Sequence, residues 1–299
     1  MARYERLTYV NENNESIVLG AGCLFHANLG SKDCSGLSEF SNTIYSTYSM
    51  GQHGDTFVSD RIEPRNIDIS GTILERSKDA QLQLRRRAIR IFNPDLSAKL
   101  IYEYKGFKRV ISCRVDNSPG FSYTEDRVYM KFSMSFKCLD PFWREEQETA
   151  TEIASWMGGW EFPTEIKRDD PTSMQFGFRS ESLIVDCYNA GDVSTGLRIR
   201  FTALATVENP SLINVNTYEK IKLNLTMQPG DVITIDTSYG SKDAVLTRAG
   251  ETSSCFRDVD IDSTYMQLEI GDNLFRYDAD SGLDSLNVTL FYSPKYLGV

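Results

Sequence analysis

The chain has 299 residues, of which 40% are hydrophobic and 25% charged, and its formal net charge at pH 7 is −10. This length predicts two domains, each large enough to bury its own core. The acidic balance argues against stable binding to duplex nucleic acid, because that affinity comes mainly from Lys and Arg at phosphates. No apolar run approaches the roughly 18 residues that cross a bilayer, and the N-terminal residues are too polar for a signal peptide. We therefore expect a protein that is made in the cytosol and either stays there or is released by lysis.

The first half of the chain is predicted to form strands around one helix. Apolar and polar residues alternate in Arg65–Ile73, which predicts a strand with one buried face. A helical pattern follows over residues 78–92, with Ser77 or Asp79 as its N-terminal cap and Asn93-Pro94 as its end. The apolar side chains that we expect to face a sheet are Leu82, Leu84, Ala88, Ile89, Ile91 and Phe92.

A hairpin and a further strand complete this half. Residues 99–104 and 107–115 flank Gly106, where we expect a turn, and residues 128–136 alternate again. Asp140-Pro-Phe-Trp143 closes the domain, and residues 144–157 fit a short helix or an irregular strand. We expect residues 1–145 to form the first domain and residues 146–299 the second. The segment from Tyr9 to Asp55 contains no motif that we recognise.

Turn residues separate short alternating segments at regular intervals in the second half. The turns are Asn189-Ala-Gly-Asp192, Asn209-Pro210 and Pro229-Gly-Asp231, and the alternating segments are residues 197–201, 221–225 and 232–235. Period-two alternation bounded by Gly, Pro, Asn and Asp is typical of antiparallel strands with one buried face. The second domain is therefore predicted to be a β-sandwich, a fold that performs no chemistry by itself.

The nucleophilic and titratable residues form no catalytic motif. The two histidines, His26 and His53, lie in no Gly-x-Ser-x-Gly, P-loop or His-Glu-x-x-His pattern. A glycosidase with two carboxylates stays open, because its acids come from distant positions and the chain has 42 acidic residues. The six cysteines lack a CxxC pair, so we expect buried thiols: Cys23, Cys34, Cys113, Cys138, Cys187 and Cys255. We assign no catalytic residue and no cofactor, and we expect a protein that is not an enzyme.

One segment has the spacing of a calcium-binding loop. Its acids at loop positions 1, 3, 5 and 12 are Asp258, Asp260, Asp262 and Glu269. Ser263 stands at position 6, where such a loop needs Gly for its sharp turn, and the apolar alternation of the segment suits a strand. We assign no metal ligand, and calcium binding at residues 258–269 stays an alternative.

Two further clusters have a structural and a functional interpretation. Arg85, Arg86, Arg87 and Arg90 share the predicted helix, where they form a nucleic-acid patch or a solvated or subunit-facing side. The acidic chain favours the second interpretation, and we hypothesise that in a ring these arginines pair with acids of the next subunit. Among the aromatic residues, Trp156 and Trp160 flank Gly158-Gly159 and are the strongest candidates for stacking on a sugar ring.

A series of short motifs runs in order from Asp140 to the end of the chain. They are Asp140-Pro-Phe-Trp143, Phe162-Pro163, Asn189-Ala-Gly-Asp192, Asn209-Pro210, Pro229-Gly-Asp231, Ile235-Asp-Thr237 with Gly240, Ser263, Leu268, Gly271-Asp-Asn273 and Tyr296-Leu-Gly-Val299. No single motif is specific, but their order and spacing resemble the distal tail proteins of long-tailed bacteriophages, the siphophage tail-component family. The resemblance is strong over residues 140–299 and looser before them.

This resemblance implies a mostly β protein. Its N-terminal domain is a β-sandwich or split barrel with one α-helix, and its C-terminal domain is a galectin-like β-sandwich. In that family six copies close into a ring, a hub on the virion tail tip that joins the tail tube protein to tail-tip or baseplate proteins. These partners include the tail-associated lysin and often receptor-binding proteins, and DNA passes through the ring without specific binding.

The resemblance thus predicts a homohexameric structural protein of a phage or prophage, assembled in the bacterial cytoplasm without a membrane partner. A carbohydrate-binding adhesion module is the first alternative, and a carbohydrate-active enzyme is the second.

Overall fold

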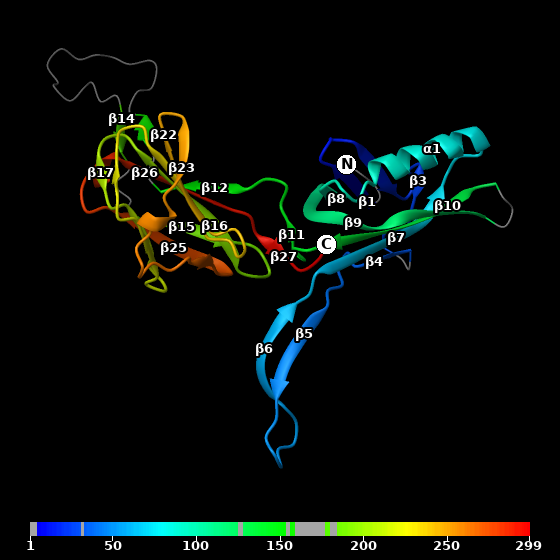
Figure 1. Ribbon diagram of the computed structural model, residues 1–299, viewed down its shortest axis with the longest axis horizontal. Coiled ribbons are helices and arrows are strands. Elements are labelled where there is room, and N and C mark those ends of the chain that lie inside the picture. Colours follow the sequence, from blue (N-terminus) through cyan, green and yellow to red (C-terminus); the bar gives the residue numbers. More distant parts are fainter. Residues whose placement is uncertain (1–4, 31–32, 125–127, 154–155, 159–176, 180–183) are drawn as a thin grey trace. The chain divides into compact units, whose positions relative to one another are not determined.

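Strands make up most of the chain, which forms two compact units (Figure 1). The computed structural model describes residues 5–30, 33–124, 128–153, 156–158, 177–179 and 184–299. The first unit consists of Met1–Glu146 and Lys295–Val299, and the second consists of Gln147–Pro294. Among the described residues there is one α-helix, α1 (Lys78–Ile91). The prediction of a mostly β fold with one α-helix is confirmed.

A closed barrel of seven strands forms the centre of the first unit. Its hydrogen-bonded order is β10 (Met130–Cys138), β7 (Arg65–Ile73), β3 (Phe25–His26), β2 (Ser16–Gly20), β1 (Arg6–Asn11), β8 (Ala98–Tyr104) and β9 (Phe107–Tyr123). The barrel closes because the first part of β9 pairs with β8 and the second part pairs with β10. β4 (Cys34–Ser35) pairs with β7, and the short pair β11 (Trp143–Arg144) and β27 (Lys295–Tyr296) adjoins β9. β2 and β3 are parallel, and the other pairs named here are antiparallel.

Local sequence patterns explain the barrel strands. Isoleucines at alternate positions of β7 point into the core, so the predicted strand Arg65–Ile73 is confirmed. The predicted hairpin at Gly106 is also confirmed, because β8 and β9 are joined by Lys105 and Gly106, whose φ angles are 49° and 87°. Two successive residues with positive φ form the tight turn that suits twisted antiparallel strands. The strand expected over residues 128–136 is β10, which begins and ends two residues later.

The helix packs against the barrel through a face that differs from the predicted one. Ala88 and Ile91 of α1 are buried with Phe92, whose ring centroid lies 4.7 Å from that of Tyr9. Leu82 and Ile89, which were expected to face the sheet, are 46% and 47% exposed, so that part of the prediction is wrong.

The face of α1 that packs on the barrel differs from the predicted apolar face because it includes a polar residue, Gln81. Gln81 is fully buried, and its Nε2 donates hydrogen bonds to the carbonyl oxygens of Glu75 at 2.6 Å and Val128 at 2.7 Å. An amide with both hydrogens satisfied can replace an apolar side chain in a core. The N-cap residue is Ser77, one of the two predicted caps, but its side-chain hydroxyl makes no capping hydrogen bond.

Two sheets enclose the core of the second unit. The larger has the order β12 (Thr149–Glu152), β26 (Leu286–Tyr292), β16 (Thr195–Ala203), β21 (Val232–Asp236), β22 (Asp243–Arg248) and β23 (Glu251–Ser254), with β24 (Gln267–Leu268) also on β16. The smaller has the order β15 (Ile184–Asn189), β25 (Gly271–Asp278), β18 (Ser211–Asn214) and β19 (Lys220–Lys222). Apolar residues from both sheets, such as Phe201 and Phe275, share one buried cluster. The predicted sandwich is confirmed.

Short elements complete the second unit. They are the strand pairs β13 (Trp156–Gly158) with β14 (Gly177–Arg179) and β17 (Val207–Glu208) with β20 (Thr226–Met227), and the 3-10 turns η1 (Phe256–Asp258) and η2 (Leu283–Ser285). The segments expected at residues 197–201 and 232–235 lie within β16 and β21. The segment expected at 221–225 is strand only up to Lys222, because Asn224 turns to donate a hydrogen bond to Asp260.

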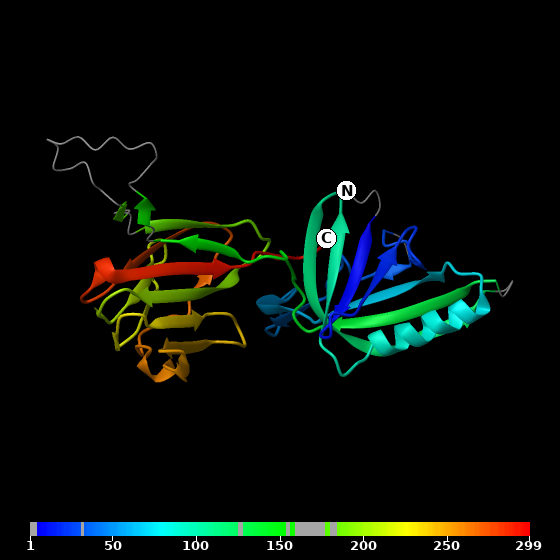
Figure 2. The same cartoon turned by 90° about the horizontal axis from the view of Figure 1, so that it is seen from above.

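A two-stranded arm extends from the barrel. β5 (Asn42–Thr47) and β6 (Thr56–Ile62) pair only with each other within the described residues, and β6 leads directly into β7. Figure 1 shows this hairpin projecting away from the barrel strands of its own unit, and Figure 2 shows it foreshortened, seen nearly along its length. We call residues 42–62 the arm. Its neck is closed by a hydrogen bond of 2.9 Å from the Glu63 amide to the Ser41 carbonyl oxygen.

Candidate assembly surface

The motif asparagines of the second unit stabilise turns. The Asn189 side chain donates to the carbonyl oxygens of Val193 at 3.1 Å and Leu268 at 3.2 Å, and it accepts from the Gly191 amide at 3.0 Å. Asn273 accepts from the Glu269 amide at 3.0 Å. Both asparagines are buried, and they satisfy backbone groups that would otherwise lack partners. These motifs therefore determine the fold of the sandwich.

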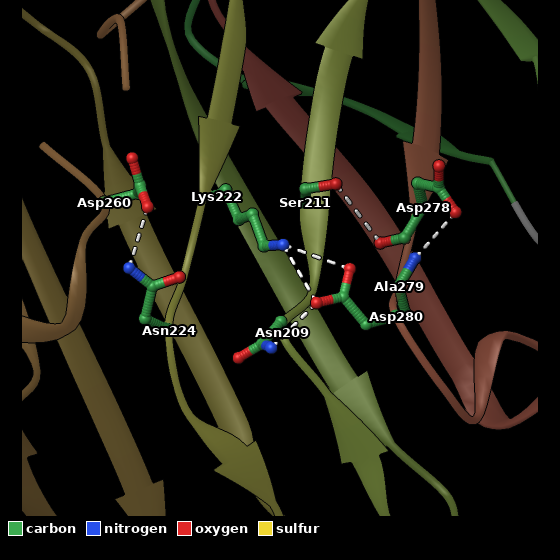
Figure 3. A network of polar contacts seen from close by, with 8 residues as sticks. All are labelled: Asn209, Ser211, Lys222, Asn224, Asp260, Asp278, Ala279 and Asp280. Carbon is green, nitrogen blue, oxygen red and sulfur yellow. Dashed lines mark hydrogen bonds and ion pairs between the residues drawn. The ribbon is translucent and has the colours of Figure 1, made fainter. Parts of the chain in front are cut away.

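A polar network at one end of the smaller sheet also stabilises a turn (Figure 3). Lys222 Nζ lies 3.0 and 2.9 Å from the two carboxylate oxygens of Asp280, and the Asn209 side chain donates to Asp280 at 2.8 Å. These hydrogen bonds, that of Lys222 first, lower the pKa of Asp280. Asn209 has a φ of 51°, so the network fixes a residue in the left-handed region beside β18. The Asn209-Pro210 motif is thus a structural turn.

The Pro229-Gly-Asp231 motif carries a buried carboxylate. Gly230 has a φ of 88°, and the Asp231 amide donates to the Gln228 carbonyl oxygen at 3.0 Å, which closes a tight turn. The Asp231 carboxylate accepts from the Gln228 amide at 2.7 Å and from Arg248, whose Nη2 lies 2.6 Å away. The Asp231 side chain is 2% exposed, whereas that of Arg248 is 49% exposed. The hydrogen bond from Arg248 is the main cause that lowers the Asp231 pKa.

Replacing Asp231 by Asn is expected to lower the free energy of unfolding at pH 7 by about 1–2 kcal/mol, which is less than the roughly 1.5–3 kcal/mol of a hydrogen bond to a charged group because Arg248 is 49% exposed. Because the folded pKa of Asp231 lies below its unfolded value of 3.8, the stabilisation is complete above about pH 4 and is lost as pH falls through the folded pKa. Urea unfolding of both proteins at pH 7 and pH 3 checks this. A difference that stays constant between the two pH values contradicts the prediction.

The calcium-like segment is held by hydrogen bonds within the chain. Asp260 accepts from the Asn224 side chain at 2.8 Å and from the Asp262 amide at 3.0 Å, and Asp258 ends η1. Among the described residues, no group of three or more His, Cys, Asp or Glu side chains lies close enough to hold a metal ion. Ser263 Oγ accepts from the Lys222 amide at 3.0 Å, which joins this segment to β19.

The candidate histidines, cysteines and tryptophans lie in different parts of the fold. His26 is on β3 and accepts from the Gly22 amide at 3.1 Å, whereas His53 is exposed in the arm. All six cysteines are free thiols, but only four are buried as predicted, because Cys23 and Cys34 are partly exposed. Burial raises the pKa of Cys34, Cys138 and Cys187 to about 12, so these thiols are protonated at neutral pH. Trp156 lies on β13, and Trp160 and Phe162-Pro163 lie outside the described residues.

The arginines of α1 have different surroundings. Arg90 Nη2 lies 2.6 Å from Glu15 Oε1 of the same chain, and the Arg85 guanidinium lies 5.6 Å from the centroid of the Phe121 ring. Arg86 and Arg87 are exposed, and no ion pair or hydrogen bond holds them within the described part of the chain. Arg90 is thus paired with Glu15 within the chain while its side chain stays 70% exposed, and the pairing of these arginines with the next subunit stays a prediction.

The arm exposes several large apolar side chains. Its side chains between 48% and 76% exposed are Ile44, Tyr45, Tyr48, Phe57 and Val58. A two-stranded hairpin alone in water is marginally stable and gains stability when another surface covers it. Contiguous exposed apolar surface is typical of a protein–protein interface. The arm is therefore the candidate assembly surface.

Sequence reasoning missed this surface. Residues 42–47 and 56–62 carry β-branched and aromatic residues, and the loop between them contains Gly51 and Gly54. Two such runs around a glycine-rich loop indicate a hairpin. The signal that the hairpin leaves the core is its mixture of apolar and polar residues on both faces.

Within the described residues, no helix is both long and apolar enough to cross a membrane. No curated protein matches the chain. Two family models do: the "Phage tail protein RIFT-related domain" over residues 27–138 and the "Siphovirus-type tail component, C-terminal domain" over residues 190–296.

Solved structures share the fold at low identity. The crystal structure of SPP1 Dit, titled a paradigm of hub adsorption apparatus in Gram-positive infecting phages, is 12% identical with a TM-score of 0.67, over 97% of this chain and 98% of that one. A chain of the phage P2 baseplate in its activated conformation with Ca is 13% identical with a TM-score of 0.51, over 100% of both chains. The chain therefore belongs to the siphophage tail-component family of distal tail proteins, and it is a structural protein of the phage tail or baseplate.

Proposed function

We propose that six copies of the chain close into a ring that joins the tail tube to the tail tip or baseplate and lets DNA pass. The arm is the observation that carries this proposal, because it is an exposed apolar hairpin that needs a second surface. An arm that docks on a different surface of the next copy makes a head-to-tail contact, which closes into a ring when the rotation fits. The number six follows the family resemblance.

The two predicted domains have separate roles in this proposal. Residues 1–145 form the ring, and residues 146–299 form a sandwich that contacts other tail proteins. The partners are the tail tube protein, the tail-associated lysin or tail-tip protein and, in some assemblies, a receptor-binding protein. A net charge of −10 per chain suits a channel that DNA crosses without specific binding. The role needs no catalytic residue, and assembly on the virion tail tip takes place in the host cytoplasm.

Purified full-length protein is expected to form annular particles. Their mass in solution should be about 200 kDa, six times the chain mass of 33.9 kDa. Light scattering coupled to size exclusion, with negative-stain images, measures this. Monomers that persist at high concentration, and also after the tail tube and tail-tip proteins are added, contradict the proposed function.

A further inference from the structure

The two faces of the arm differ in chemistry. Ile44 and Asp60 are paired across β5 and β6, and the next pair on the same face is Ser46 with Phe57, because a bulge at Val58 shifts the register of β6. Ile44, Phe57 and Asp60 therefore lie on one face. This face is apolar around an acid, and Asp60 also accepts a hydrogen bond of 3.0 Å from the Asn42 side chain. We call Ile44, Phe57 and Asp60 the arm face. The opposite face carries Tyr45 and other residues.

One flank of α1 has the complementary chemistry. Leu82, Arg86 and Ile89 are spaced by four and three residues, which places them side by side on the helix surface. The helix buries a different face, through Gln81, Ala88 and Ile91, so this flank remains uncovered in one chain. We call Leu82, Arg86 and Ile89 the helix flank. In this flank the apolar side chains of Leu82 and Ile89 lie on either side of the basic Arg86.

We propose that the arm face of one copy docks on the helix flank of the next copy, with Asp60 paired to Arg86. This inference rests on the proposed ring and names its contact. Ile44 and Phe57 cover Leu82 and Ile89, which removes four large apolar side chains from water at each contact. The surrounding apolar contacts exclude water from the ion pair, and this strengthens its attraction.

Charge complementarity favours a second copy as the occupant of the helix flank. The helix carries five basic residues, Lys78, Arg85, Arg86, Arg87 and Arg90, against one acid, Asp79. The whole chain has a net charge of −10, so a second copy presents mainly acidic surface to this basic helix. The arm supplies an acid, Asp60, with the apolar side chains of Ile44 and Phe57 on the same face.

The length of the arm fits a contact between copies. Six residues of β5 at about 3.3 Å per residue extend roughly 20 Å from the barrel, before the loop at the tip is added. Arm face and helix flank are different surfaces of one chain, so each copy gives one contact and receives another. A contact of this kind continues from copy to copy and ends only when the ring closes.

Charge exchange in the full-length chain tests this contact. Asp60→Lys alone and Arg86→Asp alone place like charges at every contact, so each should raise the concentration at which rings dissociate by about tenfold or more. The double variant restores an opposite pair in reversed order and should recover rings. Asp262→Lys and Arg257→Glu, at exposed positions of the second unit, are matched controls that should assemble as the original chain does.

Light scattering measures ring mass, and circular dichroism verifies that each variant is folded. Rings that withstand both single changes overturn the arm–helix contact while the proposed function stands. Folded single variants that dissociate without recovery in the double variant overturn the pairing of Asp60 with Arg86. Absence of rings from the original chain contradicts the proposed function itself, which separates that failure from failure of this inference.

Discussion

Removing the arm is expected to convert the ring into a folded monomer. The change replaces residues 42–62 by an Asn-Gly turn between Ser41 and Glu63, whose backbone groups are already 2.9 Å apart in a hydrogen bond. No residue of the arm belongs to the described core of the first unit, so the barrel should keep its stability. The contact between copies is lost because the apolar surface that drives it has been deleted.

Light scattering of the full-length deletion variant should give about one chain mass, 33.9 kDa, at concentrations where the original chain forms rings. Met50→Ser, at the tip of the arm, is the matched control, because it changes an exposed apolar side chain away from the paired strands. It should leave the ring intact. Annular particles of normal diameter from the armless chain would show that another surface forms the ring.

Replacing Arg65 by Met is expected to cost about 4 kcal/mol of unfolding free energy in the first unit. Arg65 is 3% exposed, and its guanidinium donates to backbone carbonyl oxygens only. Nε donates to Pro141 at 2.9 Å, Nη1 donates to Gly36 at 2.9 Å and Leu37 at 3.0 Å, and Nη2 donates to Leu297. Burial lowers the pKa of Arg65. Methionine fills similar space but leaves four carbonyl groups without this donor.

Arg65 joins three segments that are distant in sequence, and it begins the strand that follows the arm. Trp143 reinforces this junction, because its Nε1 donates to the Leu37 carbonyl oxygen at 2.9 Å. Urea unfolding measures the loss, with Arg114→Met on the exposed side of β9 as the control. Arg65→Lys should recover part of the stability, since it keeps the charge and some donors. A loss below about 1 kcal/mol for Arg65→Met would contradict the proposed junction.

Most of the fold could be predicted because its signals are local. The alternation in Arg65–Ile73, the turn at Lys105 and Gly106 and the helix before Asn93-Pro94 each depend on residues within a few positions of one another. Signals in the second unit are local too, because Asn189 and Asp231 each stabilise a turn within their own short motif. Steric preferences and short-range hydrogen bonds act before any long-range contact forms.

The candidate surface could not be predicted because it depends on what remains uncovered after folding. Leu82 and Ile89 have the same spacing as core residues, and only the burial of Gln81 by two backbone carbonyls shows which face of α1 is inside. The arm was not recognised because its strands lack a single apolar face.

The sequence by itself determined the mostly β class, the helix, the turns and the resemblance to siphophage tail components, since these follow from local patterns and their order. Only the tertiary structure decided that the barrel closes through β9, that Arg65 binds carbonyls from three distant segments, and that the arm stands free. The reason is physical: partners far apart in sequence are chosen by which surfaces the folded chain brings together, and exposure is a property of the whole packed unit.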